Sequence, residues 1–399
     1  SEEGGTTHLI ALASTPKCGP VLTNLDKIIM ELYQSGKPVF SRLLDFMRAK
    51  REIRIQTPWF HATISQDTLC RVCANLMSHL QSFEPEGPVC VSLAMAGWIH
   101  STNKLEGEQV SFDDTTSLVV GTLEPNSDKS RLVINLLNLC AATHRFPGLR
   151  PLSDLQSITP ETLQGWHEAI FREVKSGAPP TFRTTSAFCQ NHLYPNPDVI
   201  KTGVAALCNT IHLLGRWLET LDDHQQRFLG VFALASFAQF HLVDLHPWSD
   251  GNGRMCRFLA KFILDCVIPL PFPMYQDRNK YLDSLIEGRR QELKSQPVLL
   301  LHLTLIQAER FYFDMKQNAG TPCSRVLLAN DHDEMAAQIT QLDMSGAEEL
   351  LASFDRLQMG DTCTVGNIAL VRELQVPDPE AGIALARTDA LTEGDIDDI

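Results

Sequence analysis

The chain has 399 residues, of which 44% are hydrophobic and 21% charged, a composition typical of globular proteins with two or three domains. Its net charge of −14 argues against general nucleic-acid binding, because little cationic surface is available to displace counterions from phosphates. No stretch approaches 18 consecutive apolar residues, so we expect no membrane-spanning segment.

Cysteine usage points to a reducing compartment. The sequence has 11 cysteines, no recognisable secretion signal and no Asn-x-Ser/Thr acceptor, which together predict a cytoplasmic protein. Ser1 is not a natural start, so a leader ahead of it stays open. Cys70 and Cys73 have CxxC spacing, but they share one apolar helical stripe and no second pair follows, which favours packing over zinc binding.

Apolar residues at three- and four-residue intervals dominate the first half of the chain. This spacing predicts helices at residues 24–33, 40–49, 66–83, 89–101, 128–143 and 160–175. Thr159 and Pro160 give the last of these a capping residue followed by proline. A glycine and two prolines then interrupt the pattern at 176–180.

The segment 181–191 is short, β-leaning and closed by Pro195 and Pro197, so we predict a hairpin or flap between helices. Helices resume at 199–221 and 224–245. The second is apolar on nearly all sides, which predicts the buried central helix of its domain. The fold class is therefore mainly α.

The C-terminal part differs in charge. Residues 321–399 hold four basic and 16 acidic residues, a net charge of −12. We expect a small helix at 334–356, short strands near 363–376 and a disordered acidic end at 393–399. The predicted division is an N-terminal helical region at 1–84, a central domain at 85–316 and an acidic region at 317–399.

A loop with the residues of an active site follows the predicted central helix. It reads His246-Pro247-Trp248-Ser249-Asp250-Gly251-Asn252-Gly253-Arg254. Pro247 ends the helix, Asp-Gly-Asn-Gly makes a tight turn with exposed amides, and an amphipathic helix starts at Arg254. Arg254, Arg257 and Lys261 recur at helical spacing on the polar face of this new helix.

These residue types suit phosphate chemistry. Free amides at a helix N-terminus and two guanidinium groups bind an anion, and Mg²⁺ would relieve the repulsion between that anion and Asp250. His246 titrates near neutral pH and can accept a proton from an attacking hydroxyl. The loop therefore predicts phosphoryl or nucleotidyl transfer, and the sequence has no Walker-type loop.

Residues 246–257 resemble the signature of the Fic (Fido) family, HPFx(D/E)GNGRxxR, with Trp248 in place of phenylalanine. The resemblance spans about residues 85–316. It implies a helical core with a short β-hairpin flap, and a protein adenylyltransferase that moves AMP from ATP to a Ser, Thr or Tyr hydroxyl of a target protein.

The resemblance also implies residue roles. His246 would be the base, Asp250 would hold Mg²⁺, and Tyr281 would lie in the nucleoside pocket, with Arg289 where relatives often have asparagine. The phosphate-binding residues would be Gly251, Asn252, Gly253, Arg254 and Arg257. The flap that docks the target as an added strand would comprise Arg183, Thr184, Thr185, Ser186, Ala187 and Phe188.

An upstream segment, Thr102-Asn103-Lys104-Leu105-Glu106-Gly107, resembles the inhibitory motif of autoinhibited Fic proteins. In such proteins Glu106 would pair with Arg257 and occupy the place of the γ-phosphate. The same glutamate orients a water in some family members and so removes AMP from the modified protein.

Alternatives stay open at this point. The chain could use another nucleotide or a phosphocholine donor, or act as a catalytically silent Fic scaffold through its acidic region. The sequence names neither the target protein nor the oligomeric state, and a homodimer is one possibility.

Overall fold

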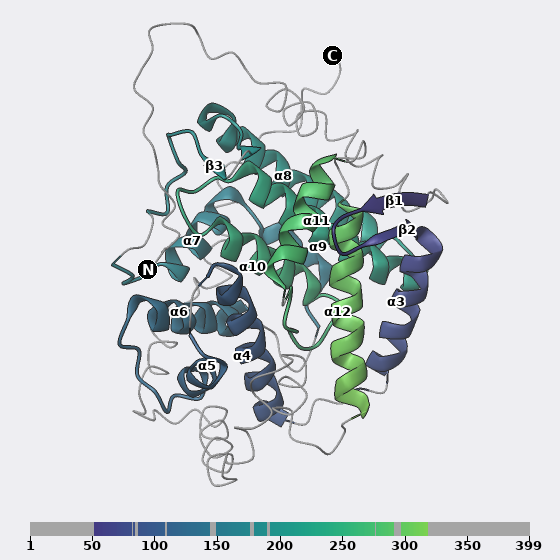
Figure 1. Cartoon of the computed structure of the whole chain (residues 1–399), viewed down its shortest axis with the longest axis horizontal. Coiled ribbons are helices and arrows are strands. Elements are labelled where there is room, and N and C mark those ends of the chain that lie inside the picture. Colours follow the sequence, from purple (N-terminus) through teal and green to yellow (C-terminus); the bar gives the residue numbers. More distant parts are fainter. Residues whose placement is uncertain are drawn as a thin grey trace, which may run out of the picture.

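The computed structural model describes residues 52–317, with gaps at 82, 84–86, 108–109, 144–148, 176–178, 190–191, 276 and 291–296, and without the side chains of 87–90. This part of the chain is mainly helical and includes two short hairpins (Figure 1). Its elements are β1 (Glu52–Gln56), β2 (His61–Ser65), α3 (Gln66–Gln81), α4 (Gly87–Leu105), α5 (Phe112–Val119), α6 (Asp128–Thr143), the 3-10 helix η1 (Leu152–Ser157), α7 (Pro160–Ile170), β3 (Phe188–Cys189), β4 (His192–Leu193), α8 (Pro197–Glu219), α9 (His224–Leu245), α10 (Asn252–Leu264), α11 (Arg278–Arg290) and α12 (Val298–Gln317).

Helix α9 is the centre of the structure, as its apolar sequence predicts. It starts at Asp223, whose carboxylate accepts hydrogen bonds from the backbone N–H groups of Gln225 and Gln226. Every residue from Phe228 to Leu245 is buried, and the helix packs against α3, α8, α10 and α12 (Figure 1). Its length and hydropathy would also suit a membrane span, but its apolar window is wholly enclosed by other parts of this chain.

Several helix predictions agree closely with the structure. Helices α6 and α9 have the predicted bounds, and α7 begins at Pro160 with the Thr159 hydroxyl accepting a hydrogen bond from the Thr162 N–H at 3.1 Å. Helix α7 ends at Ile170, earlier than predicted, and α4 continues to Leu105, beyond the predicted end. Apolar spacing identifies the helices but locates their ends less well.

The flap differs from its predicted position. The paired residues are Phe188 with Leu193 and Cys189 with His192, so the hairpin lies at the end of the predicted segment. Residues 182–187 have no strand structure. The buried Arg183 side chain binds backbone carbonyls there, so this part of the flap is held by a guanidinium group instead of a strand ladder.

The N-terminal β1–β2 hairpin was not predicted from the sequence. Its strands are antiparallel, and the buried Ile55 and Ile64 face the core beside α3 and α12. The CxxC cysteines lie on α3. Both are free thiols, and the buried Cys73 lies 3.8 Å from the Gln225 carbonyl at the start of α9, which fits the expected packing role.

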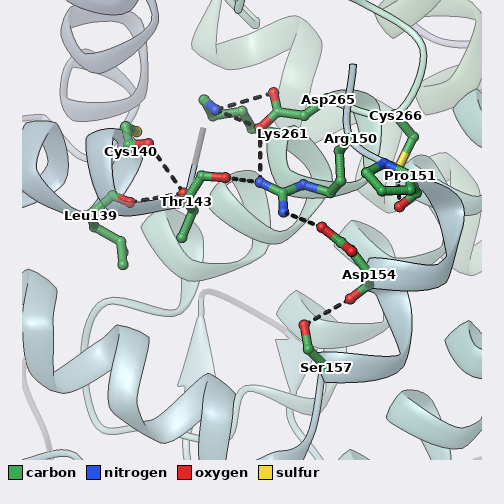
Figure 2. A network of polar contacts seen from close by, with 10 residues as sticks. All are labelled: Leu139, Cys140, Thr143, Arg150, Pro151, Asp154, Ser157, Lys261, Asp265 and Cys266. Atoms are coloured by element: carbon green, nitrogen blue, oxygen red, sulfur yellow. Dashed lines mark hydrogen bonds and ion pairs between the residues drawn. The ribbon is translucent and has the colours of Figure 1, made fainter. Parts of the chain in front are cut away.

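A buried ionic network fixes the C-terminal end of α10 (Figure 2). Lys261 Nζ donates to both carboxylate oxygens of Asp265, at 2.9 and 3.1 Å. Arg150 lies 3.8 Å from Asp265 and 3.3 Å from Asp154, and it donates to the Thr143 carbonyl. Lys261 therefore faces the core, and the polar face predicted for Arg254, Arg257 and Lys261 is buried in the structure.

Other predictions lie outside the described residues. They are the helices at 24–33, 40–49 and 334–356, the strands near 363–376 and the acidic end at 393–399.

Candidate active site

The backbone turns sharply where α9 meets the predicted loop. His246 ends the helix in the left-handed conformation, with φ 49° and ψ 58°, and its N–H donates to the Leu242 carbonyl at 3.2 Å. This conformation is unfavourable for a residue with a Cβ atom, and such strain is typical of functional sites. The turn redirects the chain, so the ring of His246 lies at the start of the loop.

Arg183 holds this turn from the flap side. Its guanidinium donates to the carbonyls of His246 at 2.6 Å, Thr185 at 2.7 Å and Pro195 at 2.6 Å. Its backbone N–H donates to the Pro247 carbonyl at 2.8 Å. The predicted flap residue Arg183 is therefore buried, and its side chain joins the flap to the loop instead of facing a target.

The middle of the loop is fixed by two buried side chains. The Asn252 amide accepts from the Trp248 N–H at 3.0 Å and donates to the Trp248 carbonyl at 2.8 Å. The Trp248 ring stacks on His167, with ring centroids 4.7 Å apart and planes inclined by 10°. Asn252 therefore shapes the turn from within, and Trp248 fills the core position predicted for an aromatic residue.

Two glycines of the loop lie in close contact with neighbouring side chains. Gly251 has φ 81°, and a Cβ atom there would overlap the Phe171 ring. A Cβ atom at Gly253 would overlap Oε1 of Glu106. The Glu106 carboxylate therefore lies directly against the first turn of α10, where backbone amides and the helix dipole favour an anion.

The end of α4 is bound to α10 by hydrogen bonds from two arginines. Arg257 Nε donates to the Thr102 hydroxyl at 2.6 Å, and Arg254 Nε donates to the Asn103 side-chain oxygen at 3.2 Å. A nitrogen of the Arg257 guanidinium also donates to Glu106 Oε1. Arg257 is 1% exposed, whereas the side chain of Glu106 is 26% exposed. The predicted pairing of Glu106 with Arg257 is therefore present.

The charges around Glu106 keep it ionised. Burial opposes ionisation, but Arg257, Arg254 and Arg278 together lower the pKa of the carboxyl below its ordinary value. Arg278, at the start of α11, also donates to the Leu105 carbonyl at 2.9 Å. Gly107 follows with φ 81°, which lets the chain leave the helix immediately after the glutamate.

The imidazole of His246 is electrically neutral at neutral pH. Burial and the nearby Arg183 guanidinium lower its pKa to about 4. Its ring stacks on Tyr194, with centroids 3.8 Å apart and planes inclined by 17°. A neutral imidazole has a free lone pair, which is the form required of a general base.

Asp250 is the one predicted metal ligand. Asp250 is exposed, and its Oδ1 accepts a hydrogen bond from the Gly251 N–H at 2.7 Å. The described part of the chain has no cluster of three or more His, Cys, Asp or Glu side chains that would form a protein-only metal site. A single carboxylate beside an anion-binding turn fits Mg²⁺, which usually takes one or two carboxylates together with phosphate oxygens.

Tyr281 is buried between α9, α10 and the residues before α11. The residue is 4% exposed, and its hydroxyl accepts a hydrogen bond from the Gln239 side chain at 3.3 Å. One face of its ring is stacked on Tyr275, and the Arg257 guanidinium lies 5.7 Å from its ring centroid. Its described contacts support Arg257, and nucleoside binding stays a prediction.

The remaining flap residues are accessible. Thr184, Thr185 and Ser186 are exposed, Ala187 is half-buried and Phe188 is 45% exposed. Leu193, which pairs with Phe188 across the hairpin, is 52% exposed. The flap therefore presents polar and apolar side chains to solvent near the loop to which Arg183 joins it.

Comparison with known proteins gives this site a family. The sequence profile of the Fic/DOC family matches residues 157–264. A Fido domain-containing protein of Dictyostelium discoideum is 37% identical over 126 residues, which are 31% of this chain and 80% of that protein.

The chain belongs to the Fic/DOC family. A protein adenylyltransferase Fic of Nematostella vectensis is 25% identical over 198 residues, which cover 49% of this chain and 44% of that protein. The chain thus spans less than half the length of this relative. The solved structure of Fic-1 from C. elegans, 16% identical, covers 62% of this chain and 70% of its own, with a TM-score of 0.47.

Sequence reasoning missed four residues that hold the Fic loop and its neighbours. His167 Nε2 donates to the Asp250 carbonyl at 3.0 Å, and Tyr194 stacks on His246. Asn103 and Arg278 hold α4 in place. Only Asn103, inside the predicted inhibitory segment, had a local signal. The others are brought to the site by tertiary packing.

Proposed function

We propose that this chain is a protein adenylyltransferase that moves AMP from ATP to a hydroxyl side chain of a target protein, and that Glu106 inhibits it. The observation that carries the proposal is the half-buried imidazole of His246 at the start of a loop whose next helix turn contacts the Glu106 carboxylate. Membership of the Fic/DOC family, with relatives named protein adenylyltransferase, supports the same activity.

In the proposed reaction, the target hydroxyl oxygen attacks the α-phosphorus of ATP. His246 accepts the hydroxyl proton, a bond forms between the oxygen and the phosphorus, and the bond from phosphorus to the bridging oxygen breaks. The products are the AMP-modified target and pyrophosphate. The amides at the start of α10, with Arg254, hold the phosphates and stabilise the charge that develops on them.

Asp250 is the residue that would hold Mg²⁺ against the phosphates. Bound there, the ion would neutralise charge on the α- and β-phosphates. The Asp250 carbonyl is held by His167 and its carboxylate by the Gly251 N–H, so the loop keeps this side chain in one place.

Inhibition follows from competition for Arg257. Its guanidinium is the natural partner of a γ-phosphate, and in this structure the Glu106 carboxylate occupies it. Bound ATP must then adopt another path for its phosphates, which misplaces the α-phosphorus for attack. When α4 moves away, Arg257 is released. The same ionised carboxylate can hold a water near the bound nucleotide, which would also permit removal of AMP.

The position of the phosphate label in ATP distinguishes AMP transfer from other reactions. The Glu106→Gly protein is incubated with Mg²⁺ and ATP labelled on either the α- or the γ-phosphate, and protein-bound label is measured. Label from the α-phosphate only supports AMP transfer. Label from the γ-phosphate would identify a kinase instead, and absence of both labels would contradict the proposed function.

The donor base is a separate question, because the loop contacts only phosphates. Arg289, which stands where relatives often have asparagine, is held by Asp244 at 2.6 Å. A panel of ATP, GTP, UTP, CTP and a phosphocholine donor tests the preference, and the proposal requires ATP to be used best.

A further inference from the structure

The catalytic-loop histidine does not stand alone in the core. Its ring lies face to face with Tyr194, and Tyr194 in turn contacts two other side chains. The His192 ring meets it edge-on at 4.8 Å, and the Arg289 guanidinium lies 6.0 Å from its ring centroid. Tyr194 is thus placed between the flap, helix α11 and His246.

The acidic side chain of Asp244 holds the two residues that contact Tyr194, His192 and Arg289. Asp244, in the last turn of α9, accepts a hydrogen bond from Arg289 Nε at 2.6 Å and lies 3.2 Å from His192 Nε2. Burial opposes its ionisation, but His192 and Arg289 lower the pKa of Asp244 to about 2. Because Asp244 and His246 are two residues apart, the ionised carboxylate ties both Arg289 and His192 to the turn that carries His246.

We propose that Tyr194 is a positioning residue that fixes the plane of the His246 imidazole, and that Asp244 and Arg289 hold Tyr194 in place. This inference rests on the proposed function, since it assigns His246 the role of base. A histidine ring rotates about two side-chain bonds, and a general base must lie within hydrogen-bond reach of the proton that it removes. A flat partner 3.8 Å away leaves one ring plane available.

Tyr194 also belongs to the flap. Its N–H donates to the Ala187 carbonyl at 3.0 Å, immediately beside the β3–β4 hairpin. A target segment that docks on the flap would therefore press on the residue that orients the base. Tyr194 thus couples target docking to alignment of the His246 ring, whereas the contacts of the Arg183 guanidinium described above are made to backbone carbonyls of the flap and the loop.

The test uses Tyr194→Phe, Tyr194→Leu and Tyr194→Ala in the Glu106→Gly protein. Histidine-selective NMR follows titration of His246, assigned by the loss of its signal in a His246→Ala protein. The other charged groups acting on His246 are Arg183, Glu106 and Arg289, and all except the already replaced Glu106 are left intact. Leu213→Ala, an exposed apolar residue on α8 outside the flap, is the control for general disturbance.

We expect the pKa of His246 to rise from its lowered value toward its ordinary value in Tyr194→Ala, because water reaches the uncovered ring face. In Tyr194→Phe it stays near the parent value. We expect kcat to fall about 10- to 100-fold in Tyr194→Leu, which keeps volume but not the flat ring, with KM for ATP unchanged. Tyr194→Phe, which keeps the flat ring, should have the kcat of the Glu106→Gly parent.

An unchanged His246 pKa in Tyr194→Ala, or equal kcat in the Phe and Leu variants, would overturn the proposal. If Tyr194→Ala does not fold, the Phe–Leu comparison still decides it. Failure of the proposed function gives a different pattern: the Glu106→Gly parent would transfer no AMP, while the His246 titration would still report on Tyr194.

Discussion

Glu106 and Arg257 form a hydrogen-bonded ion pair although 151 positions separate them in the sequence. Their contact lies on the first turn of α10, against Gly253, where a nucleotide phosphate would be bound in the proposed reaction. The chain therefore fills its own anion site with a carboxylate. The proposed autoinhibition rests on this geometry, and so do the expected effects of disturbing it.

Replacing Glu106 by glycine should raise auto-modification. The change frees Arg257 for the γ-phosphate and removes the carboxylate that lies against Gly253. We expect an increase of at least about tenfold, equivalent to one interaction of about 1.4 kcal/mol, in the rate of label incorporation from α-labelled ATP. The control is Glu124→Gly, an exposed acidic residue in a loop. Equal rates in the two variants would argue against the inhibitory role.

Arg278→Ala should release the inhibition in part. Arg278 donates to the Leu105 carbonyl and adds positive charge near Glu106, but it lies outside the loop. Auto-modification should therefore fall between the unmutated and Glu106→Gly proteins. Arg290→Ala, at the other end of the same helix and more exposed, should behave like the unmutated protein. If both arginine variants give the same rate, the Leu105 contact does not hold α4.

The half-buried His246 should make the free energy of unfolding depend on pH. Its folded-state pKa of about 4 is below the ordinary value, so the unfolded state binds more protons between about pH 6.5 and 4. Stability present above this window is lost as pH falls through it, by up to about 1.4 kcal/mol per pH unit from this one group. His246→Ala should give a shallower slope in denaturant titrations of the free energy of unfolding.

The control for this slope is His61→Ala, at an exposed position of β2. His167 and His302 also have pKa values lowered by burial, so some slope should remain in every variant. Identical slopes in His246→Ala and His61→Ala would show that His246 is not held in its neutral form by the fold.

Arg183→Lys should disturb the flap and the loop together. Lysine keeps the charge but cannot present several N–H groups in one plane, so carbonyls of His246, Thr185 and Pro195 lose their donor. Each unsatisfied buried carbonyl costs about 1–3 kcal/mol, and the midpoint of denaturant unfolding should fall accordingly. Arg172→Lys, exposed beyond α7, is the matched substitution. A midpoint equal to that of the control would exclude Arg183 as a structural link.

Much of this site was readable from the sequence because it is contiguous. Residues 246–257 lie on one loop and one helix turn, so local spacing predicted their arrangement, and the apolar sequence of α9 predicted the buried helix before them. The Glu106–Arg257 pair was predicted from the resemblance of residues 102–107 to the inhibitory motif of Fic proteins. Tyr194 and Arg278 could not be found, since their roles depend on how the flap and α11 approach His246 and α4.

Predictions of the fold that differ from the structure also concern residues whose positions depend on long-range contacts. Lys261 was predicted on a polar face of α10 with Arg254 and Arg257, but all three side chains are buried, and Lys261 joins Asp265 and Arg150 in an ionic network (Figure 2). The flap hairpin lies further along the chain than predicted. Residues before it are held by the Arg183 side chain, a long-range contact that strand propensity does not detect.

The decisive experiment for the proposed AMP transfer is intact-mass analysis of the Glu106→Gly protein with Mg²⁺ and ATP, beside the Glu106→Gly/His246→Ala protein. We expect the single variant to gain the mass of AMP, and the double variant to gain it about 10²–10⁴-fold more slowly, the usual contribution of a general base. No added mass in the single variant, or equal rates in both, would contradict it.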